Sequence, residues 1–168
     1  MEDEGPFGER QQALLGQLLM VTTGIRLIIG GLTISYTGLI TVFVPSDVAY
    51  MSTSAHALDM ANGRLLSFIA HDRAGFGGAL VSVGVAVALI AAWGWERGQS
   101  WVWWSLFASG AVGFGFALAV HIGVAYVDFW HVAPIYVGIA FTAVSLALGR
   151  RFLMAASPPA RLRVSAPI

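Results

Sequence analysis

Six ionisable residues in this sequence have types and positions that could support chemistry. Asp128 and His131 are three positions apart, a spacing that places two side chains on one face of a helix. Imidazole and carboxylate groups are suitable ligands for zinc, iron or copper, so a metal site of His121, Asp128 and His131 is one hypothesis. The full candidate cluster consists of His71, Asp72, Arg73, His121, Asp128 and His131.

Two other kinds of chemistry fit parts of this cluster. His71 and His121 fall on neighbouring apolar segments and could be the axial ligands of a b-type haem, although their depths differ by roughly 10 Å at the rise of a helix. A histidine, an aspartate and an arginine in a membrane could also serve a small transporter or proton relay. The structural alternative is a histidine that only forms a hydrogen bond inside a bundle, and we favour no cofactor.

Composition restricts the class of protein that carries these residues. The chain has 168 residues, of which 57% are hydrophobic and 11% charged, and its mean hydropathy is +0.75. Soluble domains carry about 25% charged residues, so a soluble enzyme and a disordered chain are both excluded as the leading interpretation. The net charge of zero gives no basic face for nucleic acid. Cysteine and lysine are absent, which excludes disulfides, thiolate metal sites and Schiff-base chemistry.

Four apolar runs are long enough to cross a bilayer, which requires about 20 residues. They cover residues 18–44, 74–95, 102–125 and 132–149 and form one membrane domain over 18–149. Short joints make antiparallel neighbours, so the sequence predicts an all-α polytopic membrane protein with an up-down bundle of four transmembrane helices. Residues 1–17 precede the domain, 45–73 form an outer loop, and 150–168 are predicted to be a disordered tail.

The distribution of arginine predicts the orientation of this bundle. Cytoplasmic segments carry an excess of arginine and lysine, and the arginine-rich side here is the one with both termini. We therefore expect a multi-pass protein of the cell membrane with cytoplasmic N- and C-termini and an outer loop 45–73. The arginines on the expected inner side are Arg10, Arg97, Arg150, Arg151, Arg161 and Arg163.

Three local features refine the boundaries. Arg26 lies either at the inner interface, after an amphipathic lead-in helix over 11–25, or inside the first span. Residues 54–60 could form a short helix with a serine near its start. The tryptophans around the second joint are expected to be anchors in the headgroup layer, and they are Trp93, Trp95, Trp101, Trp103 and Trp104.

Each predicted span carries a seam of small or weakly polar residues at spacings of three and four. Helices in lipid associate through such residues, so we expect all four seams to face the inside of one bundle. The seams are Thr22, Arg26, Gly30, Thr33, Thr37 and Thr41; Ala74, Gly78, Ser82 and Ala86; Ser105, Ser109, Gly113 and Ala117; and Pro134, Gly138, Thr142, Ser145 and Gly149.

One stretch resembles a known group of proteins. The segment 68–78, with the sequence FIAHDRAGFGG, together with the tryptophan-rich joint and residues 126–131, resembles small bacterial four-helix integral membrane proteins. Similar segments sometimes accompany flavin-dependent dehydrogenase domains of the dihydroorotate type, and this resemblance would imply a membrane anchor near quinones. This chain has no flavin domain of its own, and the resemblance implies a fold but no established activity.

These observations predict a non-enzymatic accessory or scaffold subunit of a membrane assembly. Its expected partners are the lipid bilayer and other membrane subunits, or further copies of the chain. The alternatives are a protein that binds a metal ion or haem b through the outer histidines, and a small transporter or proton relay.

Overall fold

The structure is a computed structural model of the chain, and it describes residues 6–156. These residues form helices and no strands, and the helices are α1 (Pro6–Ile40), α2 (Pro45–Met51), α3 (Ala55–Ala61), α4 (Leu65–Trp93), α5 (Ser100–Gly123) and α6 (Phe129–Leu153). Helices α1, α4, α5 and α6 are long and apolar enough to cross a membrane, which confirms the predicted fold class. Most of the predicted tail, from 157 onward, lies outside the described residues.

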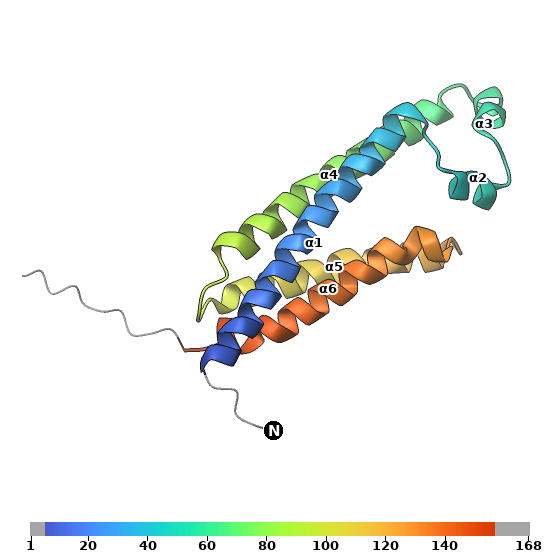
Figure 1. The fold of residues 1–168 in the computed structure, drawn as a ribbon. Coiled ribbons are helices and arrows are strands. Elements are labelled where there is room, and N and C mark those ends of the chain that lie inside the picture. Colours follow the sequence, from blue (N-terminus) through green and yellow to red (C-terminus); the bar gives the residue numbers. More distant parts are fainter. Residues whose placement is uncertain (1–5, 157–168) are drawn as a thin grey trace, which may run out of the picture.

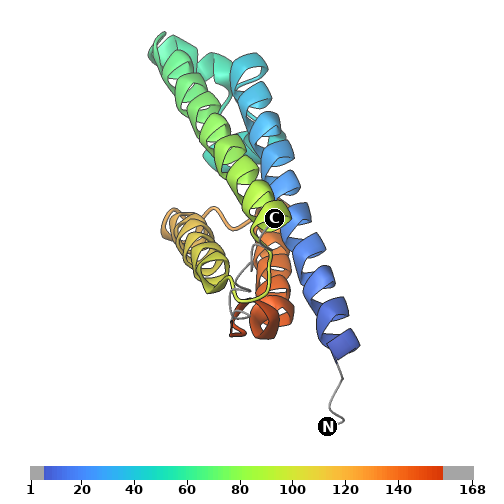
Figure 2. The ribbon, with the colours of Figure 1, turned by 90° about the vertical axis from the view of Figure 1, so that its left-hand side faces the viewer.

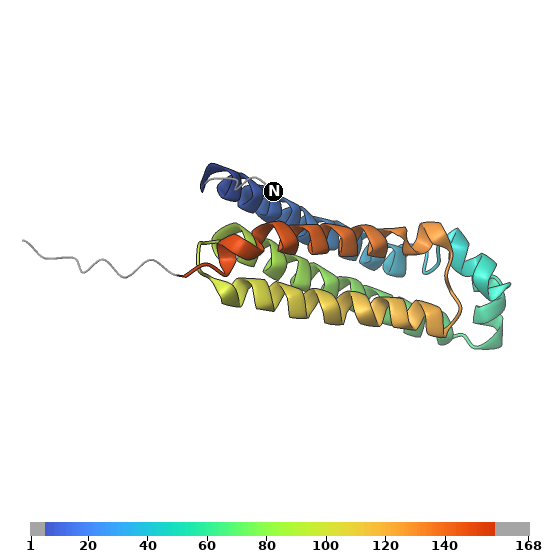
Figure 3. The same cartoon turned by 90° about the horizontal axis from the view of Figure 1, so that it is seen from below.

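The four long helices form two antiparallel pairs (Figure 1). Helix α1 packs mainly on α4, and α5 packs mainly on α6, while α1 also contacts α6. The two pairs are close together where α1 begins and α6 ends, and they separate toward α2 and α3 (Figures 1 and 2). We call these two regions the closed end and the loop end. Figure 3 shows the four helices running side by side between them.

Glycines repeated every seven residues let α1 and α4 approach closely. Gly24, Gly31 and Gly38 of α1 face α4, where Gly77 and Gly84 face α1. A Cβ atom added at Gly31 would lie 2.5 Å from the carbonyl oxygen of Gly77, and one at Gly84 would lie 2.7 Å from that of Gly24. A seven-residue repeat keeps one seam facing a partner helix over several turns. The backbones themselves are therefore in contact along this pair.

This packing corrects the prediction that all four small-residue seams face inward. The seam of α6 does so from Gly138 onward, because Gly138, Thr142, Ser145 and Gly149 are buried, whereas Pro134 is exposed. On α4 the predicted residues Gly78 and Ser82 are exposed, and a seam of Gly77, Gly84 and Ala91 is buried in their place. The inward face of α1 is likewise shifted, and on α5 the predicted seam residues Ser109 and Gly113 are exposed. Each of these helices has several small-residue faces, and only the face that opposes a partner's small residues is covered.

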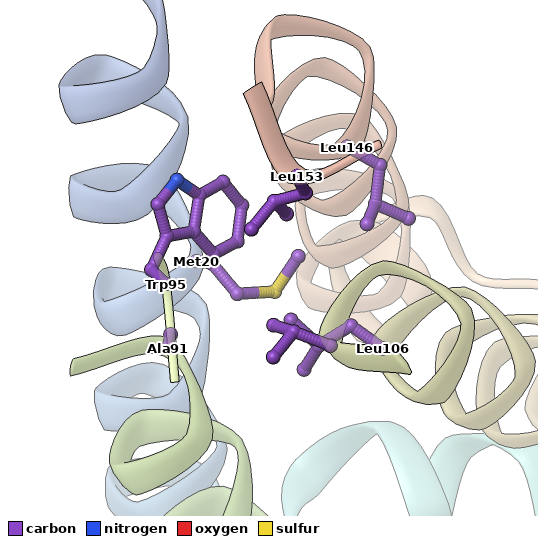
Figure 4. Packing of buried hydrophobic residues seen from close by; sticks show 7 residues of the cluster. Met20, Ala91, Trp95, Leu106, Leu146 and Leu153 are labelled. Carbon is purple, nitrogen blue, oxygen red and sulfur yellow. The ribbon is translucent and has the colours of Figure 1, made fainter. Parts of the chain in front are cut away.

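The hydrophobic core lies at the closed end, where all four long helices meet. Figure 4 shows the indole ring of Trp95 between α1 and α6, beside Leu153 and Met20. Trp95 is only 6% exposed, and the indole N–H of Trp103 donates to the carbonyl of Leu146 over 2.9 Å. The prediction that these two tryptophans are headgroup anchors is therefore wrong. Trp93, Trp101 and Trp104 are exposed.

Side-chain hydrogen bonds reinforce the same end. The hydroxyl of Ser145, fully buried on α6, donates to the carbonyl of Gly16 on α1 over 2.6 Å. The amide of Gln17 donates to the carbonyls of Ala91 and Ala92, 3.0 and 3.2 Å away. The last carbonyls of a helix have no partner within it, so Gln17 satisfies the end of α4 from a neighbouring helix.

The remaining boundaries follow from local signals. Helix α1 is continuous through Arg26, so no separate lead-in helix precedes the span. It ends where Val42 takes a left-handed conformation (φ 63°) and donates its N–H to the carbonyl of Thr37. The predicted short helix of the loop is α3, and the hydroxyl of its N-cap Ser54 accepts the N–H of Ala57 as expected.

Candidate functional site

A buried carboxylate organises the loop end. Asp47 lies in the first turn of α2 and is 3% exposed. Its Oδ2 accepts hydrogen bonds from the guanidinium of Arg73 at 2.7 Å and from the backbone N–H of Val44 at 2.9 Å. Its Oδ1 accepts the hydroxyl of Tyr126 at 2.9 Å. Both carboxylate oxygens are thus satisfied, which a buried charge requires.

Two aromatic rings and two histidines extend this arrangement. Tyr50 of α2 stacks on Tyr126 with 4.5 Å between ring centroids, and its hydroxyl donates to the carbonyl of Val124. The ring of His131 also stacks on that of Tyr126, with 4.2 Å between ring centroids, and its Nδ1 lies 3.3 Å from the tyrosine hydroxyl. The ring of His121 lies 5.3 Å from that of His131. The joint between α5 and α6 is therefore packed against α2.

The hydrogen bonds fix the roles of the ring nitrogens. The tyrosine hydroxyl donates to Asp47, so its oxygen accepts the N–H of His131 Nδ1. His121 donates its Nδ1–H to the carbonyl of Ala117 over 2.7 Å. In the neutral form, each histidine then carries its free lone pair on Nε2. Both rings are hydrogen-bonded, as the structural alternative predicts for a histidine in a bundle.

These contacts join elements that are far apart in the sequence. Arg73 belongs to α4, Asp47 and Tyr50 to α2, and Tyr126 to the α5–α6 joint. The arginine also lies over the ring of Phe43, with 5.6 Å to its centroid. We call Asp47, Arg73, Tyr50, Tyr126 and His131 the clasp, because together they connect the two helix pairs at the end where the pairs separate.

The structure brings together only part of the predicted cluster. Arg73, His121 and His131 take part in or adjoin the clasp. His71 and Asp72 form an exposed pair on α4, with 84% and 60% of their side chains accessible. Asp128 caps α6 by accepting the backbone N–H of His131 at 2.9 Å.

Metal and haem binding receive no geometric support from the described residues. Among residues 6–156, no three His, Cys, Asp or Glu side chains are close enough to hold a metal ion together. The predicted ligand set His121, Asp128 and His131 is thus not assembled into one site in this part of the chain. His71 is exposed on α4, which barely contacts α5, so it does not face His121 as an axial pair would.

Sequence reasoning missed the two residues at the centre of the clasp. The sequence places Asp47 in the outer loop 45–73 and Tyr126 in the joint between the third and fourth predicted spans, and indicates no role for either. A signal for Asp47 was present, because Pro45 at the first helical position and an acidic residue in the first turn are typical of a helix start. No sequence pattern indicates that this helix folds onto the joint at 124–128.

Comparison of the chain with protein-family models, curated proteins and solved structures gave no match.

The clasp is suited to holding helices together more than to chemistry. Its charges are mutually satisfied, and the chain of hydrogen bonds runs from Asp47 through Tyr126 to His131 at one end of the bundle. Burial and the nearby Asp47 carboxylate raise the pKa of Tyr126, which keeps its hydroxyl protonated and able to donate.

The raised pKa of Tyr126 predicts an alkaline limit to the clasp. A group whose pKa is higher in the folded state stabilises fully below its ordinary pKa, about 10 for tyrosine, and loses that contribution as pH rises through the folded value. Melting temperatures in detergent should show wild type above Tyr126→Phe up to about pH 10, with the gap closing at higher pH. Tyr36→Phe, on an exposed part of α1, is the control and should follow wild type. A gap that closes already near neutral pH contradicts this assignment.

Proposed function

We propose that this chain is a non-enzymatic subunit of a membrane assembly, and that Arg26 is the residue through which it recognises a partner. Arg26 is exposed on α1, and its guanidinium lies over the ring of Phe141, 5.4 Å from the centroid. No carboxylate pairs with it among residues 6–156, where the ion pairs are His71–Asp72, Arg73–Asp47 and Arg97–Glu9. This unpaired charge is the observation that carries the proposal.

The depth of Arg26 gives the observation its weight. Phe141 is the middle residue of α6, which has 25 residues. At 1.5 Å per residue, each end of α6 is about 18 Å away, further than an arginine side chain can extend to reach the headgroups. A guanidinium at the centre of a bilayer costs about 2.5–3.5 kcal/mol even on the mildest scale. One cation–π contact contributes about 0.5–2 kcal/mol, which offsets only part of this cost. A further partner for the guanidinium would therefore stabilise it.

The partner implied by this charge is a helix of a different protein. A carboxylate at the same depth would neutralise Arg26 and offset its desolvation. A second copy of this chain has no carboxylate at this depth. Each of its acidic residues lies ahead of α1, in a joint, in a short loop helix, or within eight residues of an end of a long helix. The proposed partner therefore carries an aspartate or glutamate within a membrane-spanning helix.

Helix α5 offers a second surface, on which a further helix of the assembly can pack. Almost all contacts of α5 with other helices are with α6, and the rest of its surface is uncovered. Its far side has a shallow groove of about 270 Å³ lined by Ala111, Val112, Gly115, Phe116 and Ala119. Small residues four apart allow close approach of another helix in lipid. The α5 face allows another helix of the assembly to pack closely, whereas Arg26 requires a partner that carries a carboxylate.

The test is the size and composition of the complex solubilised from native membranes in mild detergent. Arg26→Leu should weaken the assembly by about a hundredfold or more, because it leaves the partner's carboxylate unpaired. Arg26→Lys should retain much of it. Arg151→Leu, which removes an exposed arginine at the end of α6, is the matched control.

Crosslinking and mass spectrometry then identify the partner segment, and Arg26→Asp combined with an acidic-to-arginine change in that segment should restore the complex. A chain that remains monomeric or only self-associates overturns the proposal, and so does an assembly that Arg26→Leu leaves unchanged.

A further inference from the structure

A cavity of about 320 Å³ lies at the closed end of the bundle, away from Arg26 and from the clasp. It is formed by the first turns of α1, the α4–α5 joint and the end of α6. Its lining residues are Arg10, Ala13, Leu14, Gln17, Trp95, Arg97 and Phe152. A volume of this size falls within the range of small-ligand sites.

Two guanidinium groups give the cavity a positive charge. Arg97 is held in place by Glu9, with 2.9 Å between Nη1 and Oε1, and remains about half exposed. Arg10 is exposed and forms no ion pair with a carboxylate of residues 6–156. Arg150 and Arg151 in the last turn of α6 add charge at the same end. An anion entering the cavity would therefore meet at least one arginine that the described part of the protein does not neutralise.

Apart from one indole N–H, the rest of the lining is apolar or has no donor to spare. Leu14, Ala13 and Phe152 present hydrocarbon, and the amide of Gln17 is engaged by the carbonyls at the end of α4. Trp95 contributes its ring (Figure 4). Its buried indole N–H has no acceptor among the described residues. Charge beside hydrocarbon matches a molecule with an anionic head and an apolar tail.

We infer that this cavity binds an anionic phospholipid. The phosphate lies between Arg10 and Arg97, and the beginning of an acyl chain lies along Leu14 and Phe152. Guanidinium groups are suited to phosphate because they can donate two parallel hydrogen bonds. Basic pockets between membrane helices on the cytoplasmic side are typical lipid headgroup sites, and the arginine distribution predicts that the closed end faces the cytoplasm. A free phosphate ion shares the charge but leaves the apolar lining without a ligand.

The experiment is lipid binding to the full chain in detergent, followed by native mass spectrometry and thermal shift. Phosphatidylglycerol should bind and raise the melting temperature, and phosphatidylcholine should do so much less. Arg10→Gln and Arg97→Gln should each weaken phosphatidylglycerol binding about fivefold. Arg151→Gln makes the same change in charge at the same end but outside the lining, and should leave binding near the wild-type value.

Three outcomes contradict the inference. Equal binding of both lipids removes the role of charge, and an equal loss in Arg151→Gln shows that only the overall charge of this end matters. An inorganic phosphate titration that stabilises the protein as strongly as phosphatidylglycerol assigns the cavity to the free ion. Arg97→Gln also breaks the pair with Glu9, so Arg10→Gln, which disrupts no ion pair among residues 6–156, is the decisive variant.

Discussion

Replacing Gly31 with leucine should separate α1 from α4 and destabilise the protein by about 3 kcal/mol or more, at the upper end of the range for overpacked cores. A Cβ atom at this position would lie 2.5 Å from the carbonyl oxygen of Gly77 and 2.8 Å from both the backbone nitrogen and a side-chain methyl of Val81. A flexible side chain could move aside, but a helix backbone cannot do so without shifting the whole helix. The expected result is a large fall in melting temperature in detergent and a loss of folded protein on expression.

Gly78→Leu is the matched control for this substitution. It makes the same change one residue beyond Gly77 on α4, where an added Cβ meets no atom within 4 Å. Leucine is also the better helix former, so the control should be neutral or slightly stabilising. If both variants lose the same stability, close backbone contact is not what holds the two helices together.

The fold class was predictable because the membrane constraint acts on each helix separately. Any segment that crosses a bilayer must be long and apolar, and each span meets this requirement through its own residues, whichever helices it packs against. The pairing of helices depends on which small-residue face meets which. In α4 the sequence offers both Gly78 with Ser82 and Gly77 with Gly84. The second pair continues a seven-residue repeat that matches the one in α1, and this repeat was the available signal.

The candidate site was predictable only where helical periodicity applies. His121 follows the third predicted seam, four residues after Ala117, and His131 precedes the fourth, three residues before Pro134, so helical spacing brings the two histidines near one another. Asp72 has the same charge as Asp47 and is adjacent to Arg73 in sequence, yet it points to the surface. The carboxylate that pairs with Arg73 is instead supplied by a short helix of the loop. Such a long-range contact depends on how the loop folds, and composition and spacing do not determine that.

Replacing Asp47 with alanine should release α2 and open the loop end. The substitution leaves the Arg73 guanidinium and the Tyr126 hydroxyl without their acceptor, and breaking one partner of a buried pair costs about 3–5 kcal/mol. Arg73 is partly exposed, so the lower end of this range applies. The loss should be local, because the core at the closed end contains none of these residues. Hydrogen exchange should increase over 44–51 and 124–128, and proteases should cut the loop, while residues near Met20 remain protected.

Asp72→Ala separates this expectation from a general effect of removing negative charge near Arg73. Asp72 is an exposed neighbour whose contact with His71 belongs to the class of surface pairs that contribute about 0–1 kcal/mol, so exchange over the loop should match wild type. Asp47→Asn retains a side chain that can accept the tyrosine hydroxyl but removes the charge that holds Arg73, and it should fall between the two. If Asp47→Ala exchanges like wild type, the clasp contributes nothing to the loop end. The helix pairs would then be joined at the closed end alone, where Ser145 bonds to Gly16 and Trp95 packs between α1 and α6.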